Sequence, residues 1–377
     1  MKIVADRVIS DASTAFGGFG DVVLLDGRQI GPADLRDADL LLVRSVTRVD
    51  EHLLAGSRVR FVGTATAGTD HIDTRYLDSA GIGFAAAPGC NARAVGEYVL
   101  ACVLAWAQAT GRALERLRCG LVGVGHAGSA ARSLLEAVGV RCLAHDPPRA
   151  RREGGAGFVD LGEALGADVV SLHVPLTTEG DDATRHLLDA ARVGRLRRGG
   201  LLINAARGGV VDEAALLSRL QLGDLHAVLD CWENEPTPTP AVVAAAWVAT
   251  PHVAGHTVDA RRRATRQLQA AVAGHLGLAV PAPAGPLDEV RPCAHLEGSG
   301  FAALCNAVTL CCDPRLDTPR LQSLAATGQA ALAAGFDALR AEAGRRREFT
   351  AQPVALASLD PDTAALLHRI NFPVGSP

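Results

Sequence analysis

Three polar residues in the middle of the chain have the side-chain types that hydride transfer from a hydroxy acid requires. Arg207, Glu235 and His252 each follow a short apolar run that predicts a β-strand. An arginine can hold a carboxylate through two parallel hydrogen bonds and polarise a developing carbonyl. A histidine can accept the hydroxyl proton, and a carboxylate paired with it fixes the tautomer and raises the pKa of the imidazole. The three types together predict oxidation of a secondary alcohol next to a carboxylate.

Each of these residues has a simpler interpretation when it is taken alone. His252 stands in a Thr-Pro-His segment that could be only a turn, Arg207 could be a surface cation, and Glu235 could be a loop carboxylate. Parallel strands end at one edge of a sheet, so side chains that follow different strands gather in one crevice. We therefore interpret the three residues as one catalytic set.

A glycine-rich segment predicts a dinucleotide site at the same edge. Gly123, Gly125 and Gly128 follow an apolar run and lead into an Ala/Leu-rich helix. In this pattern the first glycine allows a tight turn, the second lets the backbone approach a pyrophosphate, and the third permits close packing of helix on strand. The N-terminus of the helix then faces the phosphates. The alternative is a glycine-rich turn that binds nothing.

An acidic residue after the next strand predicts which dinucleotide binds. Asp146 lies at the spacing expected for a carboxylate that binds a ribose 2′-hydroxyl. Such a carboxylate repels a 2′-phosphate, so Asp146 favours NAD over its phosphorylated form. Arg149, Arg151 and Arg152 lie close by in the sequence and leave the phosphorylated form open.

The apolar runs predict an α/β protein with two parallel sheets. The composition, with 48% hydrophobic but only 4% aromatic residues, suits layers packed from Ala, Val and Leu. Helices expected at 92–109 and 258–277 would connect the two sets of strands. The expected strands are 2–5, 22–25, 40–43, 61–64 and 83–86, followed by 120–123, 140–145, 169–174, 200–204, 227–230 and 248–249.

This order of elements predicts three domains. A Rossmann dinucleotide-binding domain, 93–256, is inserted into a flavodoxin-like parallel-sheet substrate domain formed by 1–92 and 257–280. Proline and glycine at 281–286 predict a linker. Residues 286–377 are then expected to form a separate small α+β C-terminal domain.

The C-terminal domain is expected to combine helices with short strands. A helical pattern covers 319–343, and the strands are expected at 353–357 and 372–374. The arginines at 345–347 are interpreted as a solvated helix end, with a phosphate contact as the alternative.

Charge and cysteine usage exclude several classes of protein. A net charge of −4 gives no support to a nucleic-acid-binding surface. The nine cysteines form no CxxC pair and no zinc-ligand pattern, which favours reduced thiols and no metal site. No apolar run is long enough to cross a membrane. We therefore expect a soluble, cytoplasmic protein.

The motifs taken together resemble those of the D-isomer-specific 2-hydroxyacid dehydrogenase family. The segments that match the family pattern are 123–128, 204–212, 229–236 and 250–255. Further segments resemble a branch of the family with a phosphorylated substrate, and these are 43–47, 61–71, 86–91, 146–149 and 345–349. The resemblance implies NAD-dependent oxidation of 4-phospho-D-erythronate to 2-oxo-3-hydroxy-4-phosphobutanoate, a step in the biosynthesis of pyridoxal 5′-phosphate.

The resemblance also assigns roles to individual residues. It implies catalysis by Arg207, Glu235 and His252, with His252 donating the proton in the reductive direction. It implies substrate contacts at Ser45 and Thr66. It implies that the last ninety residues form a homodimer. The cofactor contacts that it implies are Asp146, Val174, Ala205, Ala206, Arg207, Asp230 and Gly255.

Two positions near the expected substrate site leave alternatives open. His256 stands where the family has tyrosine, so a substrate contact there would come from a shorter side chain that can also carry charge. Arg44, beside Ser45 at a strand end, is the candidate donor to the substrate phosphate, and a structural salt bridge is the alternative.

Three competing functions remain at this stage. A sibling dehydrogenase acting on phosphoglycerate or a hydroxypyruvate-type substrate would share the catalytic set. A binding protein that senses the redox state of NAD would share the dinucleotide site without needing Arg207, Glu235 and His252. The last ninety residues could also form an effector-binding regulatory domain.

Overall fold

The computed structural model describes residues 1–280, 292–296, 298–355 and 359–375. The chain divides into two compact units. The first consists of Met1–Asn91 and Val258–Glu289, and the second consists of Ala92–Thr257 and Val290–Pro377. The linker expected at 281–286 lies outside the described residues.

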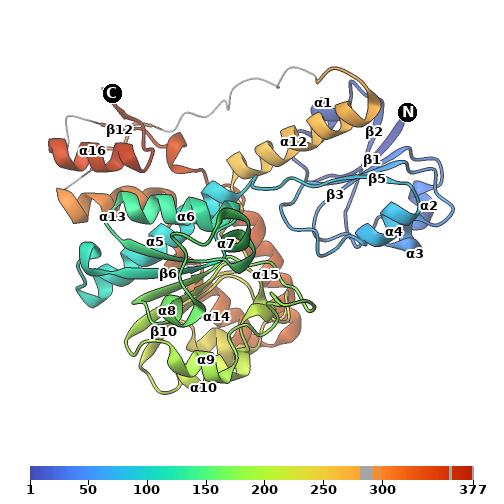
Figure 1. Cartoon of the computed structure of the whole chain (residues 1–377). Helices are drawn as coiled ribbons and strands as arrows, with labels where there is room; N and C mark the ends of the chain where they lie inside the picture. The colour runs from blue at the N-terminus through green and yellow to red at the C-terminus, as the bar shows by residue number, and fades with distance from the viewer. Residues whose placement is uncertain (281–291, 297, 356–358, 376–377) are drawn as a thin grey trace. The chain divides into compact units, whose positions relative to one another are not determined.

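A parallel sheet in the order β2-β1-β3-β4-β5 forms the centre of the first unit (Figure 1). Its helices pack on both faces of the sheet, and α12 contributes Leu268 and Val272 to the core on one of these faces. The strands are β1 (Lys2–Asp6), β2 (Asp21–Leu25), β3 (Leu40–Val43), β4 (Phe61–Thr64) and β5 (Gly83–Ala85). The helices are α1 (Ala12–Phe16), α2 (Pro32–Leu35), α3 (Glu51–Leu54), α4 (Thr74–Ser79) and α12 (Val258–Leu276).

The strand order places a topological switch point in the first unit. The chain goes from β1 to β2 on one side, while β3 pairs with the other side of β1. The crossovers that leave β1 and β3 therefore diverge, and sheets of this type bind ligands at the carboxyl ends of such strands. Arg44 and Ser45 directly follow β3 at this position.

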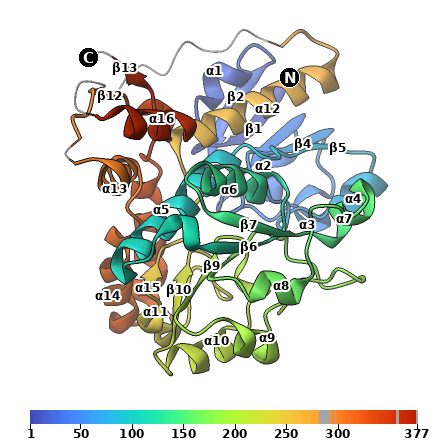
Figure 2. The same ribbon diagram turned by 60° about the vertical axis from the view of Figure 1, so that its left-hand side comes forward.

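The sheet of the second unit is also parallel, in the order β11-β10-β9-β8-β6-β7 (Figure 2). Its switch point lies between β6 and β8, where the glycine-rich segment leaves β6. The strands are β6 (Arg118–Val122), β7 (Arg141–His145), β8 (Val169–Leu172), β9 (Gly200–Asn204), β10 (Leu225–Leu229) and β11 (Val248–Ala249).

Helices cover both faces of the second sheet. On one face lie α5 (Ala92–Thr110) and α6 (His126–Ala137), and α5 is buried along most of its length because the sheet and other helices enclose it. Between α6 and α12 along the chain, this unit also contains α7 (Pro147–Glu153), α8 (Leu161–Leu165), α9 (Ala190–Arg195), α10 (Glu213–Leu220) and α11 (Pro240–Ala245).

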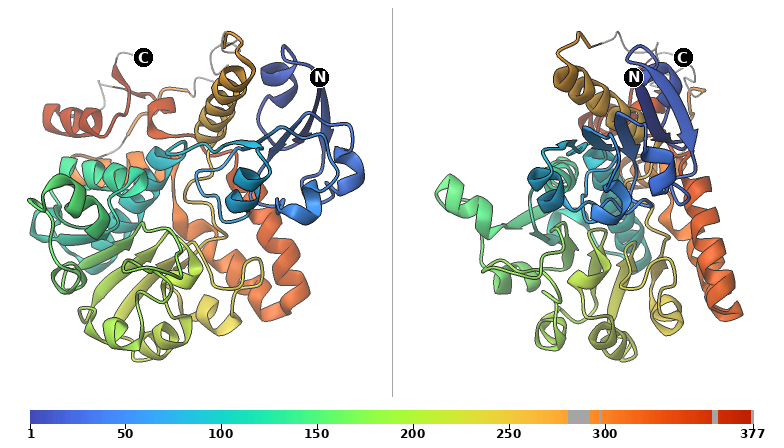
Figure 3. Two further views of the ribbon diagram at one scale, coloured as in Figure 1. Left: turned by 45° about the vertical axis from the view of Figure 1, so that its right-hand side comes forward. Right: turned by 90° about the vertical axis from the view of Figure 1, so that its right-hand side faces the viewer.

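The C-terminal residues share the cores of the second unit instead of forming a separate one. Leu304 and Phe349 belong to the core that contains α5 and α6, and Leu321 and Phe336 belong to the core on the opposite face. Figure 3 shows the long helices of this part beside the second sheet. The elements are α13 (Gly300–Cys311), α14 (Thr318–Thr327), α15 (Gln329–Ala343), β12 (Val354–Ala355), α16 (Pro361–Arg369) and β13 (Val374–Gly375).

The expected α/β class with two parallel sheets is confirmed, and the strands lie within three residues of their expected bounds. The expected helix 319–343 is instead two helices, because Gly328 adopts φ 126° between α14 and α15. The C-terminal strands form a short parallel pair, although 356–357 of the expected first strand lie outside the described residues. None of the helices in the described residues combines the length and the apolar character needed to cross a bilayer.

The shared core predicts that the C-terminal helices and the second sheet unfold together. Leu321 is fully buried, so Leu321→Ala should lower the free energy of unfolding by about 2–5 kcal/mol. Leu222→Ala is the matched control, because that side chain is 69% exposed and its truncation should cost less than about 0.5 kcal/mol. Urea unfolding followed by circular dichroism measures both. A separate early transition that alone responds to Leu321→Ala would contradict the shared core.

Candidate active site

The glycine-rich segment forms a tight loop between β6 and α6. Gly123 has φ 87°, and a Cβ added there would lie 2.9 Å from the backbone nitrogen of Val174. A Cβ added to Gly128 would lie 2.0 Å from the carbonyl oxygen of Gly123. At Gly125, the N-cap of α6, an added Cβ would meet no atom within 4 Å. The loop therefore tolerates no side chain where it packs on the protein but is open at Gly125, which fits the approach of a dinucleotide pyrophosphate.

Asp146 connects the end of β7 to this loop. Its carboxylate accepts hydrogen bonds from the backbone nitrogens of Val124 at 2.9 Å and Arg149 at 2.9 Å. Arg149 in turn donates from Nη1 to the carbonyl oxygen of Val124 at 2.6 Å and from Nε to Glu153 at 2.7 Å. Arg149 thus braces the glycine loop, and its charge is paired with Glu153. This arrangement agrees with a site for NAD, in which the ribose hydroxyls meet a carboxylate.

The other predicted cofactor residues follow the carboxyl ends of β8 to β11. Val174 packs against Gly123, and Ala205 and Ala206 follow β9. Asp230 follows β10, and Gly255 lies in the loop after β11. The structure thus brings the predicted cofactor residues of the second unit to one edge of its sheet. Their individual contacts with NAD stay predictions.

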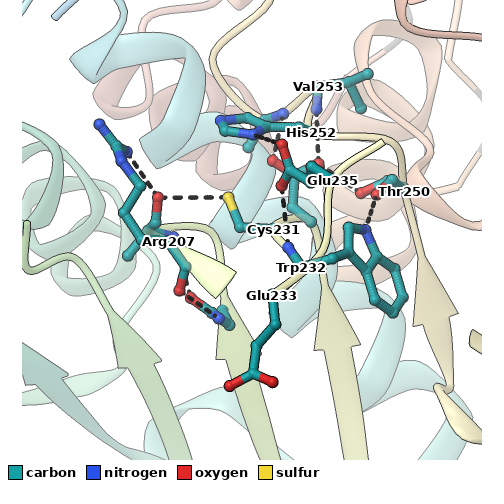
Figure 4. Close-up of polar contacts among 12 residues, drawn as sticks. Arg207, Cys231, Trp232, Glu233, Glu235, Thr250, His252 and Val253 are labelled. Carbon is teal, nitrogen blue, oxygen red and sulfur yellow. Dashed lines mark hydrogen bonds and ion pairs between the residues drawn. The ribbon is translucent and has the colours of Figure 1, made fainter. Parts of the chain in front are cut away.

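His252 and Glu235 form a hydrogen-bonded pair at this edge (Figure 4). His252 Nδ1 lies 2.8 Å from Glu235 Oε2, and Glu235 Oε1 accepts a hydrogen bond from the backbone nitrogen of Trp232 at 3.0 Å. Glu235 is thereby oriented from two sides. Because Nδ1 faces Glu235, the ring directs Nε2 away from the carboxylate, and the His252 side chain is 30% exposed. The pair has the geometry of an imidazole base whose tautomer is set by a carboxylate.

The backbone of His252 is in the left-handed region, with φ 56°. This conformation costs a residue with a side chain about 1–3 kcal/mol and persists only where the surroundings enforce it. The enforcing group is Asp230, which is fully buried. Its carboxylate accepts hydrogen bonds from Thr250 Oγ1 at 2.6 Å, Val253 N at 2.7 Å and Ala254 N at 3.0 Å. Asp230 thus holds the loop on both sides of His252.

The electrostatics of the pair favour a charged imidazole. Burial opposes the charge on His252, but Cys231 and Glu235 outweigh burial and raise the pKa of His252 well above its ordinary value of 6.5. Burial likewise opposes ionisation of Glu235, but His252 lowers the pKa of that carboxyl overall. Burial raises the pKa of the Cys231 thiol, so the thiol is neutral at neutral pH. Glu235 is therefore the negative charge that stabilises the protonated imidazole.

Arg207 enters the site from the neighbouring strand end. The carbonyl oxygen of Ala206 accepts hydrogen bonds from Arg207 Nη1 at 2.8 Å and from Cys231 Sγ at 3.4 Å. Figure 4 shows the Cys231 thiol between Arg207 and the His252–Glu235 pair. A Cβ added to Gly208 would lie 1.9 Å from the backbone carbon of Trp232, so the segments after β9 and β10 are in direct contact. Arg207 therefore lies beside the segment after β10 that carries Glu235, the partner of His252.

Cys231 is the residue of this site that the sequence did not single out. Its thiol, the Glu235 carboxylate and the His252 imidazole offer atoms that all lie within 4.8 Å of one another, a spacing that a metal ion could bridge. The direct hydrogen bond between His252 and Glu235 accounts for most of this clustering without an ion. The expectation that the chain uses no metal stays a prediction.

The predicted substrate residues of the first unit lie at the ends of β3 and β4. Arg44 Nε forms a salt bridge of 3.0 Å with Asp6, a fully buried carboxylate at the end of β1. Ser45 is exposed. Thr66 is half-buried, and its hydroxyl lies 2.7 Å from that of Thr64. The alternative proposed for Arg44, a structural salt bridge, is thus present.

The arginines at 345–347 differ from the expected solvated helix end. Arg346 donates to the carbonyl oxygens of Ala254 and Ala94, and Arg347 is only 8% exposed. Arg345 alone is exposed. His256 also meets this segment, because a Cβ added to Gly344 would lie 3.2 Å from His256 Cε1. A run of arginines predicts charge but not these contacts, since the partners of Arg346 come from distant parts of the chain.

Comparison with known proteins agrees with these features. Residues 100–254 match the family model described as D-isomer specific 2-hydroxyacid dehydrogenase, NAD binding domain. The chain is 46% identical to erythronate-4-phosphate dehydrogenase of Chromohalobacter salexigens, over 94% of each chain. It is 44% identical to the protein of the same name from Stutzerimonas stutzeri, over 98% of this chain and 99% of the relative.

Solved structures show the same fold. One is the TT0316 protein of Thermus thermophilus, with a TM-score of 0.65, 27% identity, and coverage of 75% of this chain and 99% of that one. Another is D-lactate dehydrogenase of Aquifex aeolicus complexed with NAD and lactic acid, with a TM-score of 0.61, 25% identity, and coverage of 73% and 96%. About a quarter of this chain therefore has no counterpart in either structure.

The His252–Glu235 pair predicts a change in pH dependence when the carboxylate is lost. In Glu235→Gln the pKa of His252 should fall, because burial then acts without the opposing negative charge. A neutral imidazole is needed to accept a proton, so the low-pH limb of kcat/KM for oxidation should move to lower pH. The rate on the plateau should also fall, by up to about 10²–10⁴-fold, because the ring loses its orientation.

Glu233→Gln is the matched control for this measurement. Glu233 pairs with His186 at 2.6 Å, so the variant also removes the carboxylate of a histidine–glutamate pair two residues away. Its pH limb should stay where the unaltered protein has it. Equal shifts in the two variants would contradict a specific coupling of Glu235 with His252.

Proposed function

The chain belongs to the erythronate-4-phosphate dehydrogenases of the D-isomer-specific 2-hydroxyacid dehydrogenase family, and from this premise we propose that it oxidises 4-phospho-D-erythronate to 2-oxo-3-hydroxy-4-phosphobutanoate with NAD. The reaction is a step in the biosynthesis of pyridoxal 5′-phosphate. The observation that carries the proposal is the 2.8 Å pair of His252 with Glu235, at the same sheet edge as the glycine loop. Relatives of this name are 46% and 44% identical to the chain over nearly its full length.

The roles of the site residues follow from their chemistry. The glycine loop and Asp146 would hold NAD, which would supply the hydride acceptor for the substrate carbon. His252 Nε2 accepts the hydroxyl proton as the carbonyl forms, and Glu235 stabilises the resulting imidazolium. The guanidinium of Arg207 binds the neighbouring carboxylate and polarises the new carbonyl oxygen. In the reverse direction the protonated His252 returns the proton.

A concentration of positive charge in the first unit supports a phosphorylated substrate. Burial, Arg44 and Arg262 all lower the pKa of Arg261, while Asp11 opposes them. Arginines that disfavour one another's charge in this way favour a bound anion. We assign the substrate phosphate to Arg44 and assign further substrate contacts to Ser45, Thr66 and His256. The salt bridge of Arg44 to Asp6 uses Nε, so it would hold the guanidinium in place for an anion at its Nη atoms.

The choice of substrate is tested by direct assay. Purified protein with NAD should give a kcat/KM for 4-phospho-D-erythronate at least about tenfold above that for 3-phosphoglycerate, a difference of about 1.4 kcal/mol in transition-state binding. His252→Ala should lower kcat by about 10²–10⁴-fold. Better turnover of 3-phosphoglycerate would identify a sibling dehydrogenase instead. Failure to turn over any 2-hydroxy acid would favour the NAD-sensing binding protein.

We further propose that the protein is cytoplasmic and forms a homodimer through its C-terminal part. Buried thiols at Cys102 and Cys119 support a reducing compartment. The exposed apolar side chains of Leu310 and Leu316, at 50% and 69%, support an association surface on the C-terminal part. An effector-binding role for the same residues has no comparable support.

Substitutions on this surface test the dimer without disturbing the core. The double variant Leu310→Asp/Leu316→Asp should sediment as a monomer at micromolar concentration, because it places two charges in an apolar interface. The control is Leu222→Asp, which alters a leucine that is 69% exposed but precedes the C-terminal part. A double variant that sediments as a dimer would refute this surface.

A further inference from the structure

A short segment near the C-terminus contacts the loop that carries His252. The segment is residues 344–349, which follow α15, and the catalytic loop is residues 250–257, which follow β11. About ninety residues separate them along the chain. Within the second unit they meet at Ala254, His256 and Thr257, although neither the cofactor motif nor the catalytic set requires such a contact.

Arg346 makes the central contact of this segment. Its Nη2 donates to the carbonyl oxygens of Ala254 and of Ala94, the latter at 3.3 Å, and its Nη1 lies 3.1 Å from Cys312 Sγ. One guanidinium therefore joins the catalytic loop to the start of α5 and to the end of α13. The planar fork of arginine suits this geometry, because it presents several donors in fixed directions.

The catalytic loop is held from both sides at Ala254, two residues after His252. The backbone nitrogen of Ala254 donates to Asp230 at 3.0 Å, and its carbonyl oxygen accepts from Arg346. Ala254 is fully buried, so loss of Arg346 would leave a buried carbonyl without this donor. This restraint matters because His252 itself adopts the left-handed conformation, from which a less restrained loop would relax.

Charge strengthens the contact. Burial opposes the positive charge of Arg346, but Cys312, Glu97 and Asp230 outweigh burial and raise the pKa of its guanidinium. Asp230 is fully buried, and its charge is one of the causes of the raised pKa of Arg346. Removal of Arg346 would take a positive charge away from the carboxylate that holds the catalytic loop.

Residues near Arg346 in the sequence also contact the catalytic loop. Thr257 Oγ1 donates to Glu348 at 3.2 Å, and His256 packs on Gly344. The backbone nitrogen of Phe349 donates to Glu97 of α5 at 3.1 Å, which anchors the segment to the core of the second unit.

We propose that residues 344–349 brace the catalytic loop and that Arg346 is the positioning residue through which they act. The inference rests on the proposed role of His252 as the proton acceptor. Arg346 does not take part in the chemistry. It holds the backbone of the catalytic loop so that the imidazole stays paired with Glu235. In this way the C-terminal part of the chain contributes to catalysis.

The variants Arg346→Met, Arg346→Lys and Arg345→Met test the brace in the full-length protein. Arg346→Met keeps much of the side-chain length but removes the charge and every donor. Its kcat for oxidation should fall by about tenfold to a hundredfold, as displacement of a catalytic group by about 1 Å does. The dissociation constant for NADH, measured by fluorescence, should change less than about threefold, because the glycine loop is intact. Arg346→Lys should recover part of the rate, and Arg345→Met should match the unaltered protein.

A second measurement separates positioning from a general loss of stability. The pKa of His252, followed by NMR of its ring proton, should fall in Arg346→Met because the pair with Glu235 loosens, and it should stay unchanged in Arg345→Met. If Arg346→Met does not fold, Arg346→Lys and Glu348→Gln are measured in its place, and both should lower kcat and the pKa of His252 to smaller degrees.

The outcomes distinguish the brace from the proposed function. A folded Arg346→Met with the kcat and the His252 pKa of the unaltered protein would overturn the brace. So would a loss of kcat in Arg345→Met of equal size, because it would reveal a dependence on surface charge. If the unaltered protein does not oxidise 4-phospho-D-erythronate, the proposed function fails. The change in the His252 pKa would still report on the brace in that case.

Discussion

One buried carboxylate organises the catalytic edge of the second unit. Asp230 accepts three hydrogen bonds from the loop after β11, and these bonds enforce the left-handed conformation of His252. In this conformation the imidazole lies 2.8 Å from Glu235, which Trp232 orients from the other side. An unpaired buried charge is unfavourable, so the loop and the carboxylate stabilise each other. Asp230 thereby positions the base relative to its carboxylate partner.

The C-terminal part of the chain also contributes to the structure around the catalytic loop. Its helices complete the cores on both faces of the second sheet, and Arg346 donates a hydrogen bond to the catalytic loop. About a quarter of the chain has no counterpart in the similar solved structures, so the shorter proteins of this fold manage without an equivalent length of chain. In this chain the C-terminal residues are integrated into the unit that carries His252. Changes in packing at the C-terminal part can therefore alter the position of His252 through Arg346.

Much of the fold was predictable because parallel strands are buried on both faces and appear as continuous apolar runs. The runs around Leu40 and Leu201 gave strands at their expected places. The break at Gly328 was less visible, since the flanking residues favour a helix on both sides. The sequence predicts a separate domain for the last ninety residues, but these residues share the cores of the second unit. A proline-rich stretch suggests a boundary but does not show which surfaces the following helices will cover.

The sequence by itself determined which chemistry is available: the glycine spacing, the acidic residue at Asp146, and an arginine, a glutamate and a histidine after separate strands. These features are local, since each depends on residue type and on a strand a few positions away. Only the tertiary structure decided that His252 pairs with Glu235, that Asp230 holds the catalytic loop, and that Arg346 donates to its backbone. Those contacts join residues distant in the chain, and their geometry depends on how the strands and helices pack.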